Sequence, residues 1–128
     1  MLKHVFCTSQ DFACNRPAWS NWALISITDS GAENEKINFG RNHTLLLSFD
    51  DIDYEDGEYL LFDEIHARSI LEFVEQCSNE NVEGIHVHCR KGLNRSAAIA
   101  KWIGQKYGLS FSVDYEYNKH VYSVLREV

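Results

Sequence analysis

Residues 84–107 read GIHVHCRKGLNRSAAIAKWIGQKY, and this stretch decides the fold class. Its first five residues alternate between the two faces of a short strand. The alanine-rich stretch from Arg95 to Tyr107 is typical of a helix, and Gly108 is suited to cap its carboxyl end. The intervening Cys89–Asn94 predicts a tight loop. A strand that leads through a tight loop into a helix indicates an α/β domain.

Apolar periodicity predicts the other elements. Three upstream runs are short and rich in β-forming residues, which predicts strands at Leu2–Thr8, Trp22–Thr28 and His43–Phe49. Apolar residues spaced by three and four predict helices over Leu61–Cys77 and Val113–Val128. The apolar face of the first helix would comprise Phe62, Ile65, Ile70, Phe73, Val74 and Cys77. We therefore expect an α/β fold in which helices flank a small central sheet.

Length and charge narrow the possible classes of protein. The chain has 128 residues, of which 45% are hydrophobic and 24% charged, so we expect a single domain over 1–128. A formal net charge of −7 disfavours proteins that coat nucleic acid or anionic membranes, because their phosphates would be repelled. No apolar run reaches the roughly 20 residues of a membrane helix, and MLKHVFCTSQ lacks the layout of a secretory signal. We expect a cytoplasmic protein.

The cysteines are expected to be free thiols. None of Cys7, Cys14, Cys77 and Cys89 forms a C-x2-C pair, so a structural zinc site has little support. The cluster His86-x-His88-Cys89 has metal-binding residue types, but strand alternation favours a core position for His86. We expect neither a metal nor a cofactor.

The loop after the 84–88 strand has the properties of an anion site. A loop that enters a helix turns backbone N–H groups inward, and the helix dipole adds positive charge. Gly92 gives the backbone the freedom for such a turn. Cys89 would lie among these donors and near the cations Arg90, Lys91 and Arg95, which favour a thiolate. The Arg95 guanidinium is suited to a bidentate grip on phosphoryl oxygens.

The pattern His88-Cys89-x5-Arg95-Ser96 resembles the signature loop of the cysteine-dependent protein tyrosine and dual-specificity phosphatases. The resemblance continues more weakly upstream to His43, over roughly half the chain, and is to small single-domain members of bacterial and phage type. It implies a dual-specificity-phosphatase-like fold and a metal-independent phosphatase. In it Cys89 forms a phosphocysteine intermediate and Arg95 clamps the transition state. Ser96 then assists breakdown of the intermediate, and His88 holds the loop. Substrate contacts would come from Arg90, Lys91, Gly92, Leu93 and Asn94.

The family also supplies a general acid from an aspartate on an upstream loop, which protonates the leaving oxygen. The acidic segment 50–57 is predicted to be that loop, and its candidates are Asp50, Asp51, Asp53 and Asp56. Asp51 best matches the family's order of strand, one residue, acid, and Asp53 is the next choice. At least three of the five carboxylates in this segment are expected to be solvated.

The resemblance leaves the substrate open. Protein phosphotyrosine is the first expectation, with phosphoserine, phosphothreonine or a small phosphorylated molecule as further substrates. The adjacent Arg90 and Lys91 resemble phosphatases of inositol pyrophosphates, and the Gly-x-Asn-Arg-Ser ending resembles RNA 5′-triphosphatases. An RNA 5′ end is therefore the single form of nucleic acid expected as a partner, and no membrane is expected.

Two hypotheses outside the phosphatases also remain. The chain could be a non-catalytic phosphate-binding module, or Cys89 could have a thiol-redox role. The family's phosphotyrosine enzymes usually have a deep slot with aromatic walls. Its candidates here are Phe39, Tyr54 and Tyr59.

Overall fold

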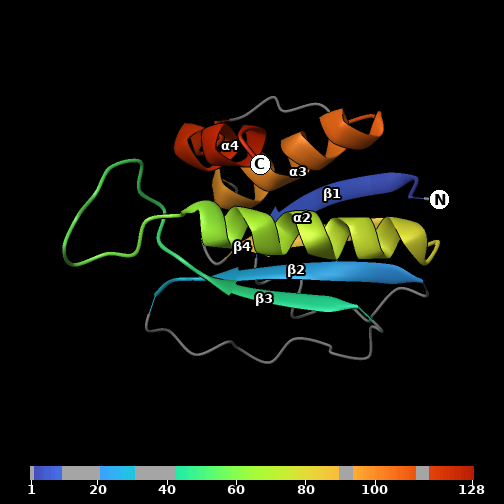
Figure 1. The fold of residues 1–128 in the computed structure, drawn as a ribbon, viewed down its shortest axis with the longest axis horizontal. Helices are drawn as coiled ribbons and strands as arrows, with labels where there is room; N and C mark the ends of the chain where they lie inside the picture. Colours follow the sequence, from blue (N-terminus) through green and yellow to red (C-terminus); the bar gives the residue numbers. More distant parts are fainter. Residues whose placement is uncertain (1, 10–20, 31–42, 90–93, 112–115) are drawn as a thin grey trace.

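The computed structural model describes residues 2–9, 21–30, 43–89, 94–111 and 116–128 (Figure 1). Within these ranges the chain forms a four-stranded sheet and three helices. The strands are β1 (His4–Ser9), β2 (Trp22–Thr28), β3 (Thr44–Ser48) and β4 (Gly84–Cys89). The helices are α2 (Glu64–Asn79), α3 (Asn94–Tyr107) and α4 (Lys119–Arg126). The predicted α/β class is confirmed.

The sheet is parallel, and its strand order is β1-β4-β2-β3. In its register Cys89 pairs with Ile27 of β2 and with Ser9 of β1, so β4 is a central strand. Thr28 pairs with Ser48 of β3. Because the strands are parallel, the segments that follow β2, β3 and β4 start at the same edge of the sheet. In open α/β sheets ligands bind at this edge.

The three helices lie on one face of the sheet. Alternate residues of the strands, including Ile25 and Val87, share one buried cluster with residues of all three helices, such as Ile70, Ile103 and Leu125. In addition, α4 contacts both α2 and α3. The alternation of β4 turns His86 and His88 to the opposite face, and these two side chains are also buried. Both faces of β4 are therefore buried.

Two positions in the structure require glycine, one because a side chain would have no room and one because of the backbone conformation. A Cβ on Gly84 would lie 2.6 Å from the ring of Trp22, so the indole occupies the space that a side chain would need. Gly108 has φ +65 and ends α3 in the left-handed region, which confirms the predicted cap.

The first helix begins later than its apolar pattern predicts. Asp63 caps α2, because its carboxylate accepts from the backbone N–H groups of Ile65 and His66. Ile65 was predicted to face the core but is 75% exposed, and that prediction is wrong. The reason is helical geometry: Ile65 stands two positions before the buried Ala67, on the other side of the helix.

The last helix begins at Lys119, not at Val113. Residues 112–115 lie outside the described ranges, and residues 116–118 are not helical. Asn118 is the N-cap, with an extended backbone and a side-chain oxygen that accepts from Val121 N at 3.1 Å. Val121 and Leu125 form the buried face.

Other boundaries agree closely with the predictions. The strand 22–28 is confirmed residue for residue, and β1 is shifted by two residues at its start and one at its end. Both ends of the predicted loop Cys89–Asn94 belong to other elements, since Cys89 is the last residue of β4 and Asn94 is the first of α3. None of the helices in the described part of the chain has the length and apolarity needed to cross a bilayer.

Candidate active site

Cys89 and Ser96 meet where β4 leads toward α3. Cys89 is the last residue of β4 and is fully buried, and its thiol donates to Ser96 Oγ at 3.4 Å. Ser96 lies in the first turn of α3 and is also fully buried. This pair places a hydroxyl beside the sulfur that the sequence predicts to be the nucleophile. The predicted substrate contacts Arg90, Lys91, Gly92 and Leu93 lie outside the described residues.

Arg95 is anchored by the ends of two strands. Its side chain is 2% exposed, and Nη1 donates to Asp29 Oδ1 and to the carbonyl oxygen of Phe49, each at 2.8 Å. Asp29 directly follows β2, and Phe49 directly follows β3. The buried Nε has no acceptor among the residues that the structure describes. The guanidinium is therefore fixed through Nη1 by the ends of two strands.

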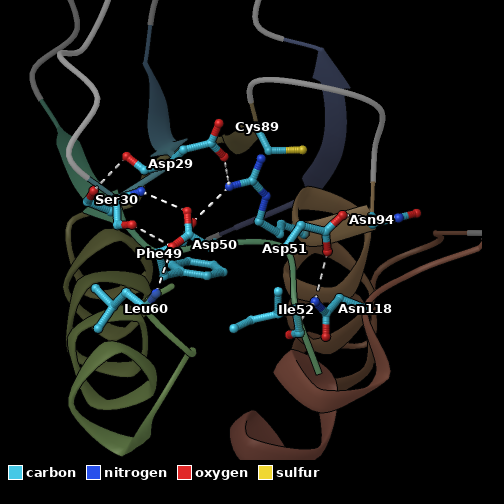
Figure 2. Close-up of polar contacts among 12 residues, drawn as sticks. Asp29, Ser30, Phe49, Asp50, Asp51, Ile52, Leu60, Cys89, Asn94 and Asn118 are labelled. Atoms are coloured by element: carbon cyan, nitrogen blue, oxygen red, sulfur yellow. Dashed lines mark hydrogen bonds and ion pairs between the residues drawn. The ribbon is translucent and has the colours of Figure 1, made fainter. Parts of the chain in front are cut away.

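Asp50, one of the four candidates for the general acid, is buried at the start of the acidic loop. Its carboxylate accepts from Ser30 N at 3.0 Å, from the Ser30 hydroxyl and from Leu60 N at 2.7 Å (Figure 2). Burial alone would raise the pKa of Asp50, but these hydrogen bonds and the charge of Arg95 together hold it below the ordinary value of 3.8. These bonds join Asp50 to Ser30, which follows β2, and to Leu60 at the far end of the acidic loop, so Asp50 closes the base of that loop.

Asp51 extends toward the start of α3. Its Oδ2 accepts from Asn94 Nδ2 at 3.2 Å, and its Oδ1 accepts from Asn118 Nδ2 at 2.8 Å (Figure 2). Asn94 is the first residue of α3, the helix that carries Arg95 and Ser96. The structure therefore brings the carboxylate of Asp51 to the same helix end as these two predicted site residues.

The remaining acidic candidates lie differently. Asp53 is exposed. Asp56 is half-buried, and its carboxylate accepts from Glu58 N at 2.9 Å, which stabilises a turn within the loop. Among the four candidates, Asp51 is the one with a hydrogen bond to α3 in the described part of the chain.

A cavity of about 530 Å³ adjoins this site. It is lined by Asp29, which holds Arg95, and by Asp51. The rest of its lining comprises Ser30, Asp50, Ile52, Glu58 and Tyr59. Four of these seven residues carry carboxylates, and the carboxylate of Asp29 is paired with Arg95. Of the predicted aromatic wall residues, Tyr59 lines the cavity, Tyr54 is exposed, and Phe39 lies outside the described residues.

Cys77 and His86 are buried in the core. Burial, with a smaller contribution from the charge of Glu80, raises the pKa of Cys77 to about 12, so this thiol stays protonated at neutral pH. The ring of His86 stacks on Phe6, and Nε2 lies 2.7 Å from the hydroxyl of Thr8.

The metal-like residue types around β4 do not form a ligand set. His88 is fully buried on the face opposite to Cys89, and its role in holding the loop stays a prediction. Cys7 is half-buried, and Cys14 lies outside the described residues. No three His, Cys, Asp or Glu side chains gather as a metal site in the ranges that the structure describes.

Two residues of the site were missed by the sequence analysis, Asp29 and Asn118. A signal for Asp29 was present, because it directly follows a buried strand and thus lies at the edge where β4 ends. Asn118 gave no signal, because the last helix was expected to start before it.

Comparison with models of protein families, with curated proteins and with solved structures finds no match for this chain. A functional assignment therefore depends on the residues at the carboxyl ends of β2, β3 and β4.

Proposed function

We propose that the chain is a metal-independent, cysteine-dependent phosphatase of the protein tyrosine and dual-specificity type, with a fold of that kind. One observation carries the proposal. A buried cysteine at the end of β4, a buried arginine at the start of α3 and an aspartate hydrogen-bonded to Asn94 of the same helix all meet at one helix end. These are the residue types that phosphate-monoester hydrolysis through a covalent intermediate requires.

In the first step the thiolate of Cys89 attacks phosphorus in line, and a phosphorus–sulfur bond forms as the bond to the leaving oxygen breaks. Asp51 gives its proton to that oxygen, so the leaving group departs as an alcohol or phenol. The guanidinium of Arg95 binds the equatorial oxygens, where negative charge accumulates in the transition state. The bonds of Nη1 to Asp29 and Phe49, which fix the position of the guanidinium, support this role.

In the second step water attacks the phosphocysteine, and the carboxylate of Asp51 takes the proton of that water. The phosphorus–sulfur bond breaks and releases inorganic phosphate. Ser96 Oγ, 3.4 Å from Sγ, donates a hydrogen bond to the departing sulfur and stabilises the regenerated thiolate. A non-catalytic phosphate-binding module would use neither the thiol nor Asp51, so both features favour the enzyme.

The acid-lined cavity favours some substrates over others. A leaving group that carries further phosphates would bring negative charge against Asp50 and Glu58, which line the cavity. This favours simple phosphomonoesters, protein phosphotyrosine first, over inositol pyrophosphates and RNA 5′-triphosphates. We place the enzyme in the cytoplasm, where Cys89 would stay reduced.

The test is hydrolysis of p-nitrophenyl phosphate in EDTA from about pH 5 to 8, the range where such acid and base groups titrate. We expect activity in the wild type and a loss of about 10³-fold or more in Cys89→Ser and Arg95→Lys. Cys77→Ser is the matched control, because it makes the same substitution at a core thiol and should retain activity. The proposal is wrong if activity requires a metal or if Cys89→Ser remains active.

A second comparison tests the acid. Asp51→Asn should lower kcat/KM for an aryl phosphate by about 10²-fold, the usual contribution of general-acid catalysis. Asp53→Asn makes the same change two residues away and should leave the rate near that of the wild type. The opposite result would move the assignment to Asp53.

A further inference from the structure

We propose that Asn118 is the positioning residue of the general acid, and that it holds the carboxylate of Asp51 against the start of α3. This inference depends on the proposed function and adds a residue to it. It follows from the hydrogen bonds of one residue whose side chain and backbone together join the acidic loop, α3 and α4.

The orientation of the Asn118 amide is determined by the helix that it caps. Only its oxygen can accept from Val121 N, which it does at 3.1 Å. The nitrogen must therefore face the acidic loop, where it donates to Asp51 Oδ1 at 2.8 Å and to the carbonyl of Ile52 at 3.1 Å. Asn118 is 8% exposed, so water competes little for these bonds.

The same residues form a closed ring. Asn118 N donates to the carbonyl of Asn94 at 2.9 Å, and Asn94 Nδ2 donates to the other oxygen of Asp51 at 3.2 Å. Each oxygen of Asp51 therefore has its own side-chain amide donor, and a backbone hydrogen bond joins the two donor residues. The position of the carboxylate is thus tied to the helix end that carries Arg95 and Ser96.

Asp51 needs such support because it lies on an exposed loop. The segment 51–60 contains no helix or strand, and Asp51 itself is exposed. A general acid must keep hydrogen-bond reach of the leaving oxygen, and a displacement of about 1 Å can lower a rate about 10²-fold. Release of the Asn118 bond would free one oxygen and the adjoining loop backbone, so proton transfer would slow while Cys89 and Arg95 stay in place.

The dependence of the hydrolysis rate on the leaving group distinguishes a positioning role of Asn118 from a purely structural one. Phenolate is a poor leaving group and needs the proton of the acid, whereas 2,4-dinitrophenolate departs without it. Loss of acid positioning should therefore slow phenyl phosphate and spare 2,4-dinitrophenyl phosphate. Loss of folded enzyme lowers both rates by the same factor.

The variant is Asn118→Ser, because serine keeps a capping oxygen for α4 but has no donor that reaches Asp51. We expect kcat/KM for phenyl phosphate to fall about 10- to 100-fold, chiefly in kcat, with 2,4-dinitrophenyl phosphate unchanged. Asn118→Asp also keeps the cap but sets a carboxylate against Asp51, and its selective loss should be at least as large. This second variant keeps the test decisive if the first folds poorly.

The matched control is Asp63→Ala, which removes the N-cap of α2 and its bonds to Ile65 N and His66 N. It should lower the free energy of unfolding without altering the ratio of the two rates. Equal losses on both substrates in the Asn118 variants, or no loss on phenyl phosphate, would overturn the positioning role and leave the phosphatase intact. A wild type that hydrolyses neither substrate would overturn both.

Discussion

Arg95 and Asp29 are joined across the sheet edge, with Nη1 of the arginine 2.8 Å from Oδ1 of the aspartate. The same nitrogen donates to the Phe49 carbonyl, so the ends of β2 and β3 together hold a guanidinium that α3 supplies. An arginine fixed before phosphate arrives needs little reorganisation in the transition state.

Loss of this support should weaken catalysis. A hydrogen bond to a charged group contributes about 1.5–3 kcal/mol, and the 40% exposure of the Asp29 side chain reduces that through solvent screening. We therefore expect Asp29→Ala to lower kcat/KM for p-nitrophenyl phosphate about tenfold. Glu72→Ala removes an exposed carboxylate from α2 and serves as the control. If both variants behave alike, Asp29 does not support Arg95.

Ser96→Ala should separate the two chemical steps. Its hydroxyl lies against the Cys89 sulfur and stabilises it as a leaving group, so breakdown of the phosphocysteine slows while its formation does not. Stopped-flow hydrolysis should show a burst near one nitrophenolate per enzyme, followed by a steady state about 10–100-fold slower than in the wild type. Ser69→Ala removes a hydroxyl bonded to the Ile65 carbonyl in α2 and should give no burst. A slowed burst phase in Ser96→Ala would contradict the assignment.

Asp50 should make stability depend on pH. Its pKa in the fold is held below 3.8 despite burial, so the unfolded chain binds its proton more tightly. The resulting stabilisation is fully present above the unfolded pKa and is lost as the pH falls through the folded pKa. Asp50→Asn cannot accept the donors on both oxygens and should lower the free energy of unfolding by about 2 kcal/mol at pH 7.

Urea unfolding between about pH 7 and pH 2 measures this effect. The difference between wild type and Asp50→Asn should shrink toward the acid end. Asp56→Asn is the control, since its carboxylate accepts one backbone bond at a half-buried position of the same loop. A pH-independent difference for Asp50→Asn would show that its charge contributes nothing.

Cys77 should affect stability but not catalysis. The thiol is fully buried, and its pKa near 12 keeps it protonated. Cys77→Ser would bury a hydroxyl in an apolar core and should cost about 1–3 kcal/mol of stability with kcat unchanged. Thermal unfolding and steady-state kinetics on the same sample measure the two effects. Loss of activity in the folded variant would show that Cys77 contributes to catalysis and is not only a core thiol.

Elements whose signals are local were predictable from the sequence. The alternation of Gly84–His88, the alanine-rich helix 95–107 and its glycine cap all depend on neighbours along the chain. The exact strand 22–28 has the same origin. The start of α4 was not predictable, because apolar spacing runs through Tyr117 whereas the helix begins where Asn118 is held by other segments.

The choice among neighbouring aspartates also needed the tertiary structure. Asp50 and Asp51 are chemically identical and adjacent, so no local pattern distinguishes them. Ser30 and Leu60 surround the first, while Asn94 and Asn118 bind the second. These partners are 10 to 67 residues distant along the chain.

By itself, the sequence determined that a cysteine lies where a buried strand ends and that an arginine and a serine lie in the first turn of the next helix, since these are relations within nine positions. The tertiary structure decided which distant groups complete that arrangement. The strand order β1-β4-β2-β3 sets Asp29 against Arg95 across 66 residues, and the packing of α4 sets Asn118 against Asp51 across 67. Such pairs form because parallel strands end at a common edge and buried polar groups need hydrogen-bond partners, and neither condition can be read from local sequence.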